Sequence, residues 1–250
     1  MRFAYSSLGN LLPRIGYLFI EVLLALVGII FILGHVLSVP PPYLNPINNY
    51  ISQYAASSSA RGLFDVTIIL CGVVFLFESY ALLGVLPHSR FVRLGCLALT
   101  LASIPMIFVA VYPTYPVSGP APNPTLWQRF QHLFHQQPPP DPGIERIAHV
   151  HDTMITVSST CLLVAIVLLG FRFITISGWR RLGWLSLGAS PFILALFVAS
   201  HATSLHGLWQ RIGFGLVFLW LVLVIRGIKK AHLRTMPKPV PVQIPASAEP

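Results

Sequence analysis

Charged residues are scarce in this sequence of 250 residues, where they make up 9%, against about a quarter in soluble domains. Only seven residues are acidic, whereas apolar residues make up 55% of the chain and gather in runs long enough to cross a bilayer. This composition excludes a soluble globular protein. The sixteen lysines and arginines are scattered over the ends of these runs and form no groove lined with aromatics, so nothing supports a nucleic-acid partner.

The sequence also lacks the short motifs of common enzyme classes. It contains no nucleophile elbow, phosphate-binding loop, cysteine pair or dinucleotide fingerprint, and whether it is an enzyme is therefore undecided. Its cysteines lie in separate apolar runs, which does not suggest a disulfide framework: Cys71, Cys96 and Cys161. The run 15–37 is too long for the apolar part of a signal peptide, and no small-residue cleavage site follows it, so we expect a retained first span.

Six apolar runs meet the requirement of about 20 residues for a helical span. They cover residues 15–37, 63–86, 92–112, 147–171, 182–200 and 208–228. Because backbone polar groups in lipid must be satisfied within their own segment, each run is predicted to be a helix. The expected fold is all-α, a polytopic bundle of six transmembrane helices over residues 1–228. A proline-rich connection at 113–146 contains a short amphipathic segment, and the basic, proline-rich tail 229–250 is expected to be disordered.

Positive residues predict the topology, because they are retained on the cytoplasmic side of a membrane. Four lie on one side of the predicted spans: Arg61, Arg129, Arg146 and Arg211. Twelve lie on the other: Arg2, Arg14, Arg90, Arg93, Arg172, Arg180, Arg181, Arg226, Lys229, Lys230, Arg234 and Lys238. We therefore expect a multi-pass protein of the plasma membrane, the cytoplasmic membrane of a bacterium, with both termini in the cytoplasm.

The fourth run begins with ionisable side chains, which lipid disfavours by several kcal/mol each. On a helical wheel one arc of about 140° holds a polar stripe: Arg146, His149, Asp152, Thr153, Thr156, Ser159 and Thr160. This stripe is predicted to face the bundle interior or water. His151 lies off the arc and is expected at the membrane interface.

Other predicted outer helix ends carry matching polar groups. Arg61 and Asp65 are four residues apart and are expected to pair. Asp152 is expected to pair with Arg146 or Arg211, which leaves one positive charge over. Together these groups are expected to form an outward-facing pocket with a net positive charge. A pocket of this kind suits a membrane lipid headgroup or a small anionic solute as partner. The candidate ligand-binding residues are Asn49, Ser52, Arg61, Asp65, Arg146, His149, Asp152, Thr156, Gln210 and Arg211.

Four short motifs mark these same helix ends. They are Asn48 to Ala55 (NNYISQYA), Tyr112-Pro113-Thr114, a histidine at the start of the fourth span, and Gly207-Leu208-Trp209-Gln210-Arg211. Together they resemble the uncharacterised six-span family catalogued as domain of unknown function 998, over residues 15–228. The resemblance implies the six-span fold and brings no established activity. Members of that family often carry one acidic residue after the serine of the first motif and another after the Pro-Thr of the second. This chain has Gln53 at the first of these positions and Tyr115 at the second.

Three alternatives stay open beside the binding pocket. In the first, the polar cluster is purely structural, and its members form hydrogen bonds and ion pairs with one another. A zinc-dependent intramembrane hydrolase is the second, with no other cofactor expected; its metal ligands would be His149, Asp152, His201 and His206. A transporter is the third, because Pro105 and Pro191 would break their helices. Glu21 and Glu78, in the predicted cytoplasmic halves of spans one and two, are expected to be protonated or paired with Arg14 or Arg172.

Overall fold

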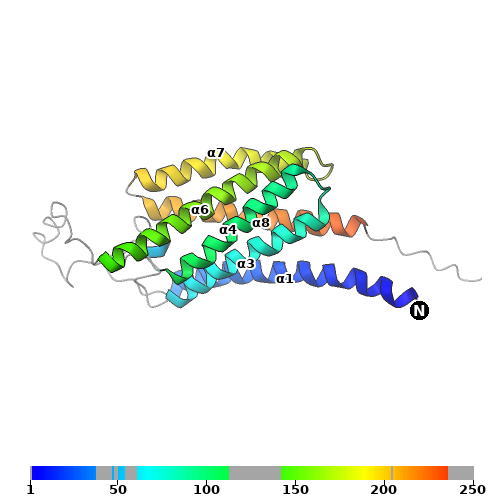
Figure 1. The fold of residues 1–250 in the computed structure, drawn as a ribbon, viewed down its shortest axis with the longest axis horizontal. Helices are drawn as coiled ribbons and strands as arrows, with labels where there is room; N and C mark the ends of the chain where they lie inside the picture. The colour runs from blue at the N-terminus through cyan, green and yellow to red at the C-terminus, as the bar shows by residue number, and fades with distance from the viewer. Residues whose placement is uncertain are drawn as a thin grey trace, which may run out of the picture.

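The computed structural model describes residues 2–37, 47, 50–53, 61–112, 142–203 and 205–235. These residues form helices and short turns and include no β-strand. The six long helices are α1 (Arg2–Leu37), α3 (Arg61–Val85), α4 (Arg90–Val111), α6 (Pro142–Ile174), α7 (Arg180–Ala202) and α8 (His206–Thr235) (Figure 1). Each contains a segment long and apolar enough to cross a membrane. The all-α, six-span prediction is confirmed.

Most of the helices are longer than the apolar runs. Hydropathy marks only the part of a helix that lipid surrounds, whereas the hydrogen-bonded backbone continues into polar sequence. Thus α1 begins at Arg2, well before residue 15, and α8 ends at Thr235. Residues 229–235, expected to be disordered, are helical. The rest of the tail and the amphipathic segment at 126–134 lie outside the described residues.

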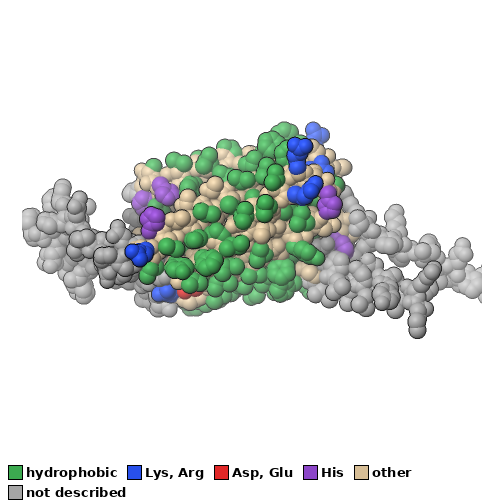
Figure 2. All heavy atoms as spheres, viewed as in Figure 1, with side chains coloured by type: hydrophobic (Ala, Val, Ile, Leu, Met, Phe, Trp, Pro, Cys, Tyr) green, Lys and Arg blue, Asp and Glu red, His purple; other side chains and the backbone are tan. Residues whose placement is uncertain are grey.

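The helices form a ring in chain order. Each packs against the next one along the chain, and α8 closes the ring against α1 while also contacting α3. The turns 86–89 and 175–179, the start of α1 and the end of α8 lie at the same end of the bundle, which we call the basic end because lysines and arginines gather there (Figures 1 and 2). The opposite end, which we call the histidine end, carries residues 50–53, the end of α7 and the start of α8. Which side of the membrane each end occupies stays a prediction.

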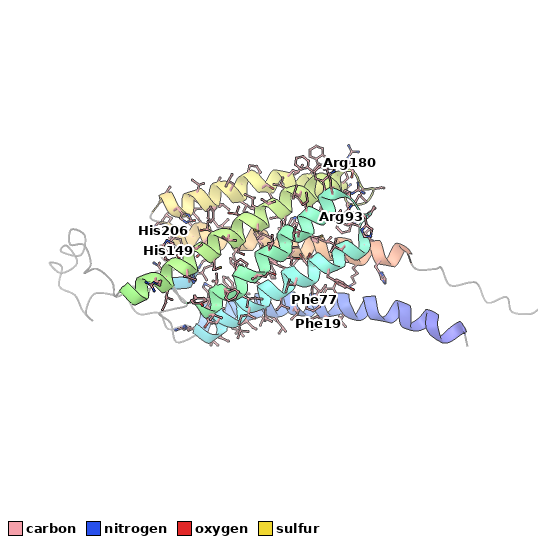
Figure 3. The ribbon with its side chains drawn as sticks, in the orientation of Figure 1. Phe19, Phe77, Arg93, His149, Arg180 and His206 are labelled. Carbon is pink, nitrogen blue, oxygen red and sulfur yellow. The ribbon has the colours of Figure 1, made fainter. Side chains whose placement is uncertain are left out.

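The core lies along the ring axis and is apolar. Its fully buried members come from four helices and include Leu82, Leu99, Ile166, Leu169, Phe173, Val224 and Ile228. Between α1 and α3, the rings of Phe19 and Phe77 pack edge to face with centroids 5.2 Å apart (Figure 3). Large apolar side chains also stay exposed on every helix, as a surface in contact with lipid requires.

Close contacts hold α6, α7 and α8 together at the basic end. A Cβ atom on Gly183 would lie 2.5 Å from the backbone nitrogen of Ile174, so only glycine permits this approach of α7 to α6. Trp179, in the turn before α7, stacks on Phe173 with ring centroids 4.8 Å apart. A Cβ atom on Gly227 of α8 would lie 2.7 Å from the same indole. Trp179 therefore lies where the three helices meet.

Neither Pro105 nor Pro191 breaks its helix. The structure has α4 continuous through Pro105 and α7 continuous through Pro191. Nearby hydroxyls donate to backbone carbonyls in the preceding turn: Ser103 to Thr100 at 2.6 Å and Ser190 to Ser186 at 2.7 Å. The broken helices that favoured a transporter are thus not present in α4 or α7.

Candidate functional site

At the histidine end, the segment that follows α1 packs onto the start of α8. The backbone N–H of Leu208 donates to the carbonyl of Ile47 at 2.9 Å. The N–H of Ile51 donates to Oε1 of Gln210 at 2.6 Å. Two of the motifs that carried the family resemblance, far apart in the sequence, therefore meet here.

Gln53 caps the short helical turn 51–53. Its Oε1 accepts a hydrogen bond from the backbone N–H of Tyr50 at 3.1 Å, as the third residue of a capping box does. An amide oxygen accepts this bond as a carboxylate oxygen would. The glutamine at this position is therefore compatible with the local fold.

Tyr50 lies at the centre of this end. Its hydroxyl donates to the carbonyl of Ser200 at 2.9 Å, and its ring stacks on that of His206 with centroids 4.9 Å apart. The ring of His201 lies 6.4 Å away on centroids. Burial raises the pKa of the Tyr50 phenol, and the negative charge of Asp152 raises it further. The phenol therefore keeps its proton at neutral pH and acts as a hydrogen-bond donor.

Two histidines beside Tyr50 have one ring nitrogen already engaged. Nδ1 of His206 donates to the carbonyl of Ser200, and Nδ1 of His201 donates to the carbonyl of Phe197 at 2.9 Å. In a neutral imidazole the other nitrogen is then an acceptor. In that tautomer both rings offer Nε2 as a hydrogen-bond acceptor.

Asp152 does not form the ion pair expected for it. In the described part of the chain its carboxylate pairs with neither Arg146 nor Arg211. Arg211 instead donates from Nε to Nε2 of His35 at 3.2 Å and from a terminal nitrogen to the carbonyl of Gly207 at 3.0 Å. The physical reason is the ring order, because α6 packs on α4 and α7 and does not reach α8.

Of the other acidic groups, one confirms its prediction, one corrects it, and Glu78 lacks, within the described ranges, the arginine pair that was one of its two predicted states. Arg61 and Asp65 pair at 3.5 Å, as predicted from their spacing. Glu21 pairs with Lys229 at 2.8 Å rather than with either expected arginine. The side chain of Glu78 is fully buried, and neither of its carboxyl oxygens has a hydrogen-bond partner among the described residues. The apolar core thus contains an isolated carboxyl group.

The polar stripe of α6 faces away from the bundle. The opposite side of α6 makes the contacts with α4, where Ser158 donates to the carbonyl of Ala102 at 2.8 Å and Nδ1 of His151 donates to that of Tyr112 at 2.6 Å. The exposed side carries Arg146, His149, Asp152, Thr153, Thr156 and Thr160, with Ser159 half-buried beside them. The stripe therefore does not face the bundle interior, which was one of its two predicted environments. His151, predicted at the membrane interface, is 3% exposed and packs against the end of α4, and its depth in the membrane stays a prediction. A helical wheel shows which residues share a face and not which face the neighbouring helices cover.

The hydroxyls of this stripe present oxygen acceptors. Thr153 donates to the carbonyl of His149 at 2.7 Å, and Thr156 donates to that of Asp152 at 2.8 Å. Because each hydroxyl proton is used by its own helix, each oxygen can still accept a hydrogen bond, although that of Thr153 also lies 3.4 Å from Nδ1 of His149. Together with the Asp152 carboxylate, these oxygens make the face rich in acceptors.

The remaining predicted site residues divide as follows. Ser52 is half-buried on the short turn beside α8, and Asn49 lies outside the described residues. In the described ranges no three histidine, cysteine or acidic side chains lie close enough together to hold a metal ion. The zinc site at His149, Asp152, His201 and His206 therefore stays a prediction. The sequence reading missed Tyr50, although it lies inside the quoted NNYISQYA motif.

Comparison with known proteins places the chain in a family. No curated protein and no solved structure matches it. One family model matches residues 20–227, from the first span to the last, and its description is protein of unknown function (DUF998). This match includes the segment around Tyr50, the exposed stripe of α6 and the start of α8. The chain therefore belongs to the DUF998 family of membrane proteins of unknown function.

Proposed function

We propose that the histidine end binds the headgroup of a membrane phospholipid that carries both a phosphate and an ammonium group. The observation that supports this most directly is that Asp152 has no cationic partner among the described side chains. Its carboxylate is exposed on a membrane-spanning helix. A bare carboxylate at the edge of the hydrocarbon is disfavoured, so a ligand that brings a positive charge is stabilised there.

Acceptors lie on the exposed face that carries Asp152 and beside Tyr50, whose phenol the charge of Asp152 influences. The oxygens of Thr153 and Thr156 lie on the same exposed face, and the free Nε2 atoms of His201 and His206 lie beside Tyr50. A primary ammonium group carries three N–H donors and matches such a set. The quaternary ammonium of choline has no N–H donor and matches it less well.

The phosphate is assigned to Arg146. Of the three arginines first expected to form a cationic pocket, Arg61 pairs with Asp65, and Arg211 donates to His35 and to a backbone carbonyl. Arg146 is exposed six residues before Asp152, about 9 Å along the helix axis, a distance that a flexible arginine side chain shortens. A headgroup with both charges therefore fits this end better than a simple anion.

The test is thermal unfolding of the purified protein in detergent with added lipid. Phosphatidylethanolamine at about 100 times its dissociation constant is expected to stabilise the protein by about 2.7 kcal/mol. Phosphatidylcholine with the same acyl chains is expected to stabilise it less. The change Asp152→Asn should abolish the preference for ethanolamine, and Arg146→Gln should weaken binding of both lipids.

The matched control is Asp65→Asn, which removes a carboxylate of the same end that already has a partner. This variant should keep the ethanolamine preference of the unaltered protein, even if it melts at a lower temperature. Equal responses to the two lipids in the unaltered protein, or an ethanolamine preference that survives Asp152→Asn, would contradict the proposal. Stronger stabilisation by phosphatidylglycerol that depends on Arg146 would favour an anionic ligand at this end instead.

A further inference from the structure

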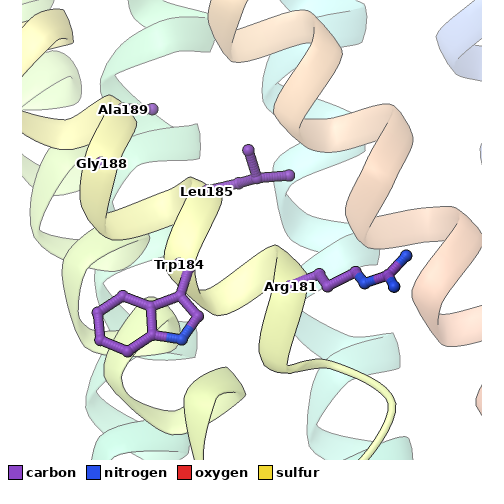
Figure 4. Close-up of a pocket in the computed structure, with 5 residues that line it drawn as sticks. All are labelled: Arg181, Trp184, Leu185, Gly188 and Ala189. Atoms are coloured by element: carbon purple, nitrogen blue, oxygen red, sulfur yellow. The ribbon is translucent and has the colours of Figure 1, made fainter.

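A hollow lies at the basic end of α7, far from the site proposed above. It has a volume of about 580 Å³ and is lined by Arg181, Trp184, Leu185, Gly188 and Ala189 (Figure 4). These residues span about two turns of one helix. Apart from one guanidinium group, the lining is apolar.

Small residues create the hollow. A Cβ atom on Gly188 would meet nothing within 4 Å, and Ala189 adds only a methyl group. The neighbouring side chains of Trp184 and Leu185 are each 58% exposed and form its walls. In a bilayer such a surface faces hydrocarbon, so an apolar chain can fill it without displacing any side chain.

Positive charge surrounds the mouth of the hollow. Arg181 is exposed and has no ion-pair partner in the described part of the chain, and Figure 4 shows it projecting from α7 in the same direction as Leu185. Arg180 precedes it, and further lysines and arginines gather at this end (Figure 2). Among the described residues, the half-buried acid Glu21 of α1 is already paired with Lys229. The local charge is therefore complementary to an anion.

We propose that this hollow binds an anionic phospholipid. Its phosphate contacts the Arg181 guanidinium, and one acyl chain lies along Leu185, Gly188 and Ala189. Arginine binds phosphate oxygens through paired N–H donors. Trp184 lies about one turn from the start of α7, and indole rings prefer the headgroup region at the end of a span. A soluble phosphate would use only the arginine, whereas a lipid uses the arginine and the apolar hollow together.

The experiment is native mass spectrometry of the full-length protein incubated with phosphatidylglycerol or with phosphatidylcholine of identical acyl chains. The unaltered protein is expected to retain phosphatidylglycerol preferentially. Arg181→Gln should lower its retention about tenfold, since a charge-assisted contact is lost. Gly188→Leu should lower retention of both lipids, because the new side chain occupies the hollow.

Each variant has a matched control. Gly84→Leu introduces the same side chain at another exposed glycine with nothing within 4 Å of its Cβ position, and Arg180→Gln removes a neighbouring charge. Both should retain phosphatidylglycerol as the unaltered protein does. Unchanged retention in Arg181→Gln, or an equal loss in Arg180→Gln, would overturn the proposal, the second because it indicates general attraction to a basic surface. Asp152→Asn should leave this retention unchanged, so the two lipid sites succeed or fail separately.

Discussion

Replacement of Glu78 by methionine is expected to stabilise the protein. The side chain is 0% exposed and both carboxyl oxygens lack hydrogen-bond partners in the described structure. Phe75 and Leu82, about one turn before and after it on α3, belong to the apolar core. Methionine has a similar length and volume and a flexible chain, so it can occupy the same space without leaving a cavity.

The size of the effect follows from the cost of burying an unsatisfied polar group. That cost is about 1–3 kcal/mol in mutational data, and removing the carboxyl group should recover it. For a chain of this length, each kcal/mol corresponds to a shift of about 2–4 °C in the melting temperature. The melting temperature of Glu78→Met in detergent should therefore rise by about 2–12 °C.

The matched control is Glu21→Met, which makes the same chemical change at a partly exposed glutamate. That residue pairs with Lys229 at 2.8 Å, and both side chains are accessible to solvent. Loss of such a pair should cost about 0–1 kcal/mol, so this variant should melt slightly lower than the unaltered protein. If Glu78→Met melts at or below the unaltered protein, the carboxyl group has a stabilising partner and the reasoning is refuted.

Three further outcomes are expected. Gly183→Val should destabilise the protein by about 1–3 kcal/mol because its side chain meets the backbone of α6, whereas Gly188→Val should be close to neutral, as melting temperatures would show. His151→Ala removes a buried hydrogen bond and should cost about 1–2 kcal/mol, whereas His149→Ala, on the exposed face, should stay within about 0.5 kcal/mol; equal losses would contradict the orientation of α6. Reporter fusions should place the C-terminus inside the cell and the 113–141 connection outside, and the reverse pattern would overturn the topology.

The sequence predicts those features that depend on one helix at a time. Long apolar runs identify the spans because each span must satisfy its own backbone. The Arg61–Asp65 pair is predictable because residues four apart on a helix are neighbours. Helix ends are less predictable, because hydropathy does not indicate where the polar extension of a helix ends. The continuation of α8 to Thr235 is an example.

Features that depend on how helices are arranged could not be predicted in the same way. Asp152 and Arg211 both lie near the same end of the bundle, yet the ring order separates their helices. Either side of α6 could have faced the interior, and close packing against α4 selects the side with His151 and Ser158. The role of Tyr50 depends on a contact with α7, far along the chain.

Trp179 holds α7 against its neighbours at the basic end of the bundle. Its ring stacks on Phe173, next to the last residue of α6, and lies against Gly227 of α8, while Trp179 directly precedes α7, so this residue joins three helices. If α7 tilts about Trp179, the displacement of each residue grows with its distance from Trp179. The far end of a span of 20 residues lies about 30 Å away. A slightly larger residue at position 227 would push on the indole of Trp179 and tilt α7. It would therefore displace the imidazole of His201, near the far end of α7, more than the indole itself.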